Sequence, residues 1–299
     1  MRNLISVFTR VLACALALTL LPLAALAQVV ELPIDATGGL PFQGKFDKNV
    51  RVYEDPSIRV EWNKVENGDT HFNCIYYYAK IKIAHASQLR TEAVDGFDRI
   101  TRVPQAKAQV LARRTNAVLA VNGDFYGTRP ESYVLRQGVE YRSTMGPNQD
   151  ILLIDEDGDF HVLLAADNPA EIDKTTISGK KVINALSFGP ALIVDNQTVL
   201  VETSSPTMSA PESRCQRMCI VQTGPLEYMA ICVRMVGCTA QEMVELVYEL
   251  CDNVEVAYLL DGGDSSQMVF MGQLINKTDR DARKVSDIVY FASAYQPEE

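Results

Sequence analysis

Apolar residues occur along this chain mostly in short runs that have the length of β-strands. Residues 117–121 (AVLAV) and 254–260 (VEVAYLL) are rich in β-branched side chains, which is typical of buried strands. In residues 74–84 (CIYYYAKIKIA), lysines alternate with isoleucines, which predicts a strand with one end facing water. About ten segments along the chain can be interpreted as strands in this way.

Helical spacing is convincing in two places. Pro104 begins the sequence PQAKAQVLARRTN, and proline suits the first turn of a helix because its missing N–H would have no partner there. Thr239 and Glu242 form a capping box ahead of apolar residues at helical spacing. Because strands and helices do not alternate regularly, we predict a single α+β domain with a mixed sheet of about ten strands and two main helices.

Residues 1–27 resemble a secretory signal peptide. Arg2 and Arg10 come before or at the start of an apolar stretch, and Ala-Leu-Ala at 25–27 fits a cleavage site. We therefore expect cleavage after Ala27 and a mature chain that is secreted to the extracellular space, the periplasm or the cell envelope. No later apolar run approaches the roughly 20 residues that span a bilayer, so we expect no membrane segment in the mature chain.

The mature chain is expected to form one domain after an irregular N-terminal segment. Residues 28–70 are rich in proline and glycine breakers, with one strand expected at 58–62. Residues 71–299 are expected to form the folded domain. The net charge of −10 and the scarcity of Lys/Arg clusters argue against nucleic acid or an anionic membrane as a partner. Small molecules, neutral glycans and proteins remain as partners.

Six cysteines remain once Cys14 is removed with the signal peptide. An even number in an exported chain favours disulfide bonds over zinc, since no C-x-x-C pair is present. Sequence does not choose among the 15 possible pairings of six cysteines. Cys251 is the expected exception, because it falls on the apolar face of a helix, where a buried thiol is common.

Polar residues follow two of the predicted buried strands at the point where each strand ends. Asn122-Gly123-Asp124 comes after one strand, and Asp261-Gly262-Gly263 comes after the other. We interpret the two as neighbouring strands that bring their polar ends to one side of a shared sheet, where α/β proteins commonly bind ligands. Tight turns with the aspartates bound to turn amides are the alternative interpretation.

Six short motifs follow one another in a fixed order. They are AVNGDFY at 120–126, VLRQG at 134–138, FGPALI at 188–193, RMCIVQTGPL at 217–226, LLDGGDSSQM at 259–268 and RKVSDIVYF at 283–291. In these motifs the chain resembles the phosphodiester glycosidase family, from about Tyr76 to Tyr290. The resemblance implies hydrolysis of a sugar 1-phosphodiester, with an α-linked N-acetylglucosaminyl group as the expected sugar and no cofactor.

The chemistry of such a reaction assigns roles to residues within these motifs. Two carboxylates complete a glycosidase-type site, and Asp261 and Asp124 are the candidates. Arg217, with Arg136 as second choice, is the candidate to bind the phosphate. The remaining candidates bind the substrate through backbone amides, hydroxyls or an amide side chain: Asn122, Gly262, Gly263, Ser265 and Ser266.

Three positions depart from the family pattern and keep other functions open. Leu259, Val221 and Asp264 stand where the family has Asn, Gly and Gly. These departures favour, as the main alternative, a non-catalytic glycan-binding or envelope-binding domain on the same fold. Asp264 with Asp261 is also a candidate pair for Ca²⁺, although one D-x-x-D pair is a weak pattern. A phosphodiesterase that cuts the other P–O bond would require metal.

Overall fold

The computed structural model describes residues 28–34, 38–66, 74–99, 103–201, 212–276 and 282–298. The expected signal peptide lies outside the described residues. Within them, no helix is long and apolar enough to cross a membrane.

The largest element is an eight-stranded sheet in which every neighbouring pair is antiparallel. Two of its strands, β2 (Val52–Asp55) and β3 (Ile58–Val65), come from the segment expected to be irregular with one strand at 58–62. In spatial order the strands are β14 (Gln197–Thr198), β13 (Ala191–Val194), β17 (Val256–Leu260), β15 (Cys215–Gly224), β16 (Glu227–Cys238), β4 (Tyr76–Ile83), β3 (Ile58–Val65) and β2 (Val52–Asp55).

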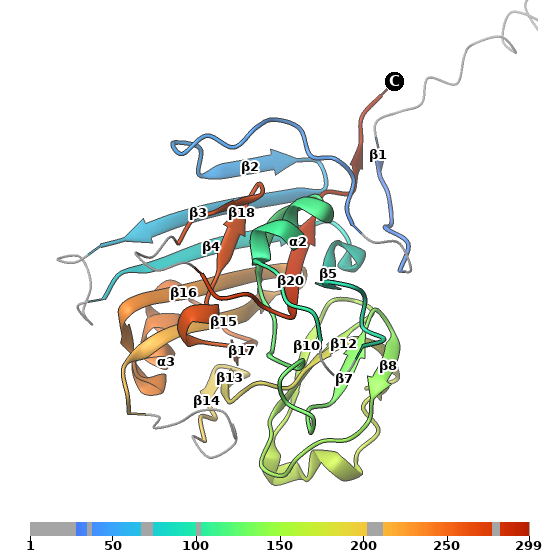
Figure 1. The fold of residues 1–299 in the computed structure, drawn as a ribbon, viewed down its shortest axis with the longest axis vertical. Helices are drawn as coiled ribbons and strands as arrows, with labels where there is room; N and C mark the ends of the chain where they lie inside the picture. Colours follow the sequence, from blue (N-terminus) through green and yellow to red (C-terminus); the bar gives the residue numbers. More distant parts are fainter. Residues whose placement is uncertain are drawn as a thin grey trace, which may run out of the picture.

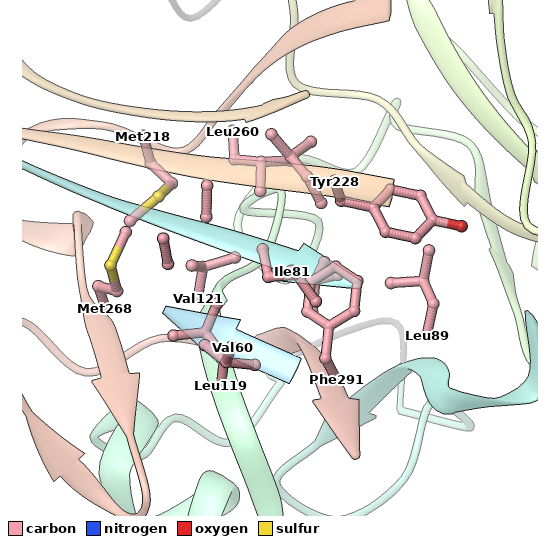
Figure 2. Packing of buried hydrophobic residues seen from close by; sticks show 14 of the residues in the cluster. Val60, Ile81, Leu89, Leu119, Val121, Met218, Tyr228, Leu260, Met268 and Phe291 are labelled. Carbon is pink, nitrogen blue, oxygen red and sulfur yellow. The ribbon is translucent and has the colours of Figure 1, made fainter. Parts of the chain in front are cut away.

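A five-stranded antiparallel sheet packs against the eight-stranded sheet (Figure 1). Its strands, in spatial order, are β19 (Gln273–Leu274), β18 (Met268–Phe270), β6 (Ala117–Asn122), β20 (Asp287–Ala292) and β5 (Leu89–Ala93). Figure 2 shows the core between the two sheets, where Leu119 and Val121 of β6 lie among Val60, Ile81 and Leu260 of the larger sheet. The core thus lies between two sheets and not on one side of a single sheet.

One helix covers the outer face of each sheet. Helix α3 (Ala240–Leu250) packs on the eight-stranded sheet through Met243 and Val247, and its capping box at Thr239 is confirmed. Helix α2 (Ala108–Arg114) packs on the five-stranded sheet through Leu111 and Ala112. This helix begins four residues later than Pro104, because Ala106 is instead paired with Val285 in an isolated β-bridge.

The remaining described strands form two further antiparallel sheets, and short 3-10 turns connect several elements. One is six-stranded and contains β10 (Phe160–Leu163), β9 (Ile151–Asp155), β12 (Lys180–Leu186), β7 (Val134–Arg136), β8 (Val139–Arg142) and β11 (Thr176–Ile177), and the other pairs β1 (Gln28–Val29) with β21 (Tyr295–Gln296). The 3-10 turns are η1 (Ala86–Gln88), η2 (Ala165–Asp167), η3 (Pro169–Glu171) and η5 (Gly263–Ser265).

Two expectations about the fold need correction. The two helices and the mixed α and β content agree with the prediction, but the strands form four sheets instead of one mixed sheet of about ten strands. Strand-length apolar runs identify strands but do not say which strands pair. The expected disulfides are also not formed, because no two of the six cysteines within the described residues are bonded to each other. Cys219 and Cys232, for example, face opposite sides of the eight-stranded sheet, and Cys251 is a buried thiol as expected.

Candidate active site

The candidate site lies where β6 and β17 end. These strands belong to different sheets, yet the backbone amide of Asp261 donates to the carbonyl of Gly123 at 3.2 Å. The buried side chain of Asn122 strengthens this junction, because its Nδ2 donates to the carbonyl of Asp261 at 2.8 Å and its Oδ1 accepts from the amide of Gln267 at 3.0 Å. The two polar strand ends therefore meet as expected, but between two sheets, and the Asn122 amide is occupied by backbone.

Next to this junction, one fully buried guanidinium holds two carboxylates. Nη2 of Arg136 lies 2.9 Å from Oδ1 of Asp124 and 3.3 Å from Oδ2 of Asp287, and all three side chains are buried. Asp124 also accepts from the amide of Ser187 at 2.9 Å and from the amide of Tyr126 at 3.2 Å. Asp124 is therefore fixed by charge-assisted hydrogen bonds on both of its oxygens.

Asp287 is less well satisfied than Asp124. Its Oδ1 has no hydrogen-bond partner among the described residues, and its pKa is raised by burial and then by the charge of Asp124, while Arg136 opposes the rise. Two carboxylates beside one guanidinium cannot both ionise freely in a buried site. Within the cluster of Asp124, Arg136 and Asp287, Asp287 is therefore an acid that holds its proton more strongly than usual.

Asp261 lies beside this cluster and is slightly accessible, with 9% of its surface exposed. Burial raises the pKa of Asp261 to about 6, while the nearby hydroxyl of Ser265 and the charges of Arg283 and Arg129 limit the rise. A carboxyl group with a pKa near neutral pH can both accept and release a proton in catalysis. Asp261 is therefore chemically suited to general acid or base catalysis.

The cavity next to Asp261 is small. It has a volume of about 10 Å³ and is lined by Gln105, Gly123, Phe125, Asp261 and residues 284–287. A space of this size holds about one water molecule. Two backbone hydrogen bonds between Ala106 and Val285, at 2.8 and 3.0 Å, hold part of its wall. A sugar therefore does not fit in this cavity unless its wall at residues 284–286 moves.

Arg217 does not join the two acids. Its Nε donates to the carbonyl of Cys238 at 2.8 Å and its Nη2 donates to the carbonyl of Ser213 at 3.2 Å. The main chain next to Arg217 does contact the site. The carbonyl oxygen of Gln216 is so close to Gly262 that a Cβ added to Gly262 would lie 2.8 Å from it. Residues 123 and 261 thus meet, while Arg217 lies apart, and the guanidinium that contacts Asp124 belongs to Arg136, which it shares with Asp287.

The other candidate residues surround Asp261 within the loop that follows β17. Gly262 and Gly263 lie at the start of η5, and the φ angle of +60° at Gly263 is a conformation that favours glycine. Ser265 and Ser266 are buried, and Ser266 Oγ has no hydrogen-bond partner in the part of the chain that the structure describes.

Asp264, the weak candidate for a Ca²⁺ ligand, accepts a hydrogen bond from a neighbouring amide side chain. The Nε2 of Gln216 donates to Oδ1 of Asp264 at 3.3 Å. The described residues contain no group of three or more His, Cys, Asp or Glu side chains that could hold a metal ion.

Sequence reasoning did not single out Asp287 or Arg129. Asp287 is part of the RKVSDIVYF motif, and an acidic residue at the start of a buried strand was an available signal. Arg129 follows Asp124 by five residues in a loop, and nothing in its sequence context marked it. Its position depends on the loop from 123 to 133 folding back toward Asp124.

Comparisons with known proteins identify the family and the fold of the chain. The family model of the phosphodiester glycosidases matches residues 115–292, which is more than half of the 299 residues. Among solved structures, the zebrafish N-acetylglucosamine-1-phosphodiester alpha-N-acetylglucosaminidase catalytic domain, auto-inhibited by its pro-peptide, is similar in fold. It is 14% identical with a TM-score of 0.59, over 86% of this chain and 89% of that chain.

A second solved structure, a hypothetical protein from Synechocystis, is 15% identical with a TM-score of 0.54, over 78% of this chain and 62% of that chain. A search of curated proteins found no match. At these identities the structural similarities concern the fold, and the match to the family model identifies the family. The chain belongs to the phosphodiester glycosidase family.

Proposed function

We propose that this protein hydrolyses a sugar 1-phosphodiester to the free sugar and a phosphomonoester. An α-linked N-acetylglucosaminyl group is the proposed sugar, which the name of the zebrafish enzyme supports. The observation that carries the proposal is Asp261, whose pKa is raised to about 6, next to the pair of Asp124 and Asp287 on Arg136. We also propose that residues 1–27 direct export, so that the substrate is met outside the cytoplasm.

In the proposed reaction, Asp261 acts on water. The ionised Asp261 takes a proton from a water molecule as the water oxygen bonds to the anomeric carbon. The bond between that carbon and the phosphate oxygen breaks, and its electron pair leaves with the phosphomonoester. A phosphomonoester is a good leaving group, with a second pKa of about 6, so the reaction needs little general acid assistance. Asp124, held by Arg136, is the second carboxyl group of the proposed site.

The test is turnover of UDP-N-acetylglucosamine and of the methyl phosphodiester of N-acetylglucosamine. Free sugar with a phosphomonoester supports the proposal, and sugar 1-phosphate would instead indicate cleavage of the other P–O bond. Asp261→Asn should abolish turnover while the protein remains folded. The matched control is Asp252→Asn, because Asp252 is exposed and lies near the same strand. Wild-type turnover in Asp261→Asn would refute the role of Asp261.

A non-catalytic glycan-binding domain is the second candidate function. It is favoured by the departures from the family pattern at Leu259, Val221 and Asp264. Binding of N-acetylglucosamine phosphodiesters without turnover, in the wild-type protein and over a range of pH, would support this alternative. An assay with EDTA separates both candidates from a metal-dependent phosphodiesterase, because only the latter loses activity.

A further inference from the structure

Arg129 lies beside the acids of the candidate site and has unused hydrogen-bond donors. Its Nη2 donates to the carbonyl of Ser187 at 2.5 Å. Its Nε and Nη1 are buried, and neither has a hydrogen-bond partner among the described residues. The ring of Phe188 lies against the guanidinium, with 5.3 Å between the ring centroid and the central carbon Cζ. Because the ring covers one face, a ligand reaches the free donors most readily in the plane of the guanidinium.

The charge of Arg129 acts on the catalytic carboxyl groups. Burial lowers the pKa of Arg129, and the charges of Asp124 and Asp261 oppose this shift. The same interaction is one of those that limit the rise in the pKa of Asp261. Arg129 is therefore near both acids, but it is bonded to neither, and buried donors without acceptors are energetically unfavourable. An anionic ligand would satisfy them.

Three other arginines near the site have most of their donors bound to protein acceptors, although Nε of Arg136 has no partner among the described residues. Arg136 is enclosed and shared by Asp124 and Asp287, and Arg217 donates to two backbone carbonyls. Arg142 donates to the carbonyls of Ser132 and Tyr126. Arg129 thus differs from all three in having a buried and unfilled set of donors next to Asp261.

We propose that Arg129 binds the phosphate group of the substrate, and this inference rests on the proposed function. A guanidinium forms strong charge-assisted hydrogen bonds with phosphate oxygens. The phosphate bound there lies next to Asp261, where the bond between the sugar and the phosphate must break. Arg129 thereby takes the role for which the sequence suggested Arg217 or Arg136, and it makes the site selective for phosphodiesters over neutral glycosides.

Binding and activity measurements test the proposal separately. Binding of inorganic phosphate and of neutral N-acetylglucosamine is measured by isothermal titration calorimetry for wild type, Arg129→Gln, Arg129→Lys and Arg99→Gln. Arg99 is the control, because it is an exposed arginine whose side chain is 63% accessible. We expect Arg129→Gln to weaken phosphate binding by about tenfold or more, as for the loss of charge-assisted hydrogen bonds, and to leave the binding of neutral sugar unchanged. Arg129→Lys should weaken phosphate binding by a smaller factor, and Arg99→Gln should match wild type.

Wild-type phosphate affinity in Arg129→Gln, or no phosphate binding by the wild-type protein, overturns the inference. If circular dichroism shows that Arg129→Gln does not fold, the phosphate affinity of Arg129→Lys is the test. An affinity equal to that of wild type in Arg129→Lys then overturns the inference. Turnover distinguishes the inference from the proposed function. Phosphate binding through Arg129 without hydrolysis of any phosphodiester leaves the inference standing and refutes the function. Hydrolysis of the phosphodiester that is equally fast in Arg129→Gln refutes the inference and leaves the function standing.

Discussion

Gly123 and Asp287 are in such close contact that no side chain fits at position 123. A Cβ built on Gly123 would lie 2.1 Å from Oδ1 of Asp287, which is far inside van der Waals contact. The amide of Gly123 also donates to the carbonyl of Asp287 at 3.0 Å. Because Gly123 lies between Asn122 and Asp124, this contact sets the position of both residues relative to Asp287. Position 123 in the NGDFY motif is therefore a glycine because any side chain there would collide with Asp287.

A substitution at Gly123 should therefore disturb the acid cluster. Gly123→Ala forces the Asp287 carboxylate or the main chain of residues 122–124 to move, because the site has no spare volume. Overpacking of a buried site typically costs about 1–3 kcal/mol, and we expect a loss of this size in the free energy of unfolding. Urea unfolding measures it, with Gly179→Ala as a control because a Cβ at Gly179 meets nothing within 4 Å. The substitution restricts the unfolded chain equally at both glycines. Gly179 has a φ of +80°, so Gly179→Ala also strains the backbone, and this strain must be subtracted from the loss of stability measured for the control.

The second prediction concerns the buried guanidinium. Arg136→Met leaves Asp124 and Asp287 without their shared counter-charge, and breaking a buried ion pair of this kind costs about 3–5 kcal/mol. The control is Arg59→Met, because Arg59 pairs with Glu54 and Glu61 on the surface and should change stability little. Denaturant unfolding at pH 7 measures both. Equal stability of the two variants would contradict a central role for Arg136 in holding the acids.

Part of this site follows from sequence and part does not. The polar residues after two apolar strands indicated that the ends of these strands come together, and they do so through Gly123 and Asp261. Asp287 also lies within the RKVSDIVYF motif at residues 283–291. In contrast, the pattern could not show that β6 and β17 belong to different sheets, because apolar runs of the same kind occur in both. It also could not show that Arg217 donates to the carbonyl of Cys238. This contact depends on the pairing of β15 with β16, which brings the end of β16 next to the start of β15.

The third prediction is the dependence of stability on pH at Asp261. Its pKa rises from 3.8 to about 6 on folding, so the folded protein keeps a proton that the unfolded chain releases between these pH values. The unfavourable contribution is therefore absent below pH 3.8, grows as the pH rises and is complete above pH 6. Asp261→Asn removes it and should stabilise the protein by about 3 kcal/mol at pH 8, with no gain at pH 3.5. Urea unfolding at both pH values measures this, and equal effects at the two would contradict the raised pKa.

The fourth prediction connects Asp261 with catalysis. If the ionised carboxylate is the base, kcat/KM should rise with pH and level off above a midpoint near 6. Arg129→Gln removes a positive charge that limits the pKa of Asp261, so the midpoint should shift to higher pH. The exposed Arg99→Gln should leave the midpoint unchanged. A midpoint that falls in Arg129→Gln would show that Arg129 does not act on Asp261 in this way.

The last prediction concerns how a sugar reaches a cavity of about 10 Å³. The amides of Ala106 and Val285 donate to each other's carbonyls at 3.0 and 2.8 Å, and they hold residues 284–286 over Asp261. If substrate displaces this wall, the hydrogen exchange of both amides should become faster when N-acetylglucosamine 1-phosphate is bound. The amide of Val289, in the middle of β20, is the internal control because it lies inside the sheet and away from the wall. Unchanged exchange at Ala106 and Val285 in the saturated complex would mean that the ligand binds without opening this wall, and the substrate would then have to approach Asp261 from another direction.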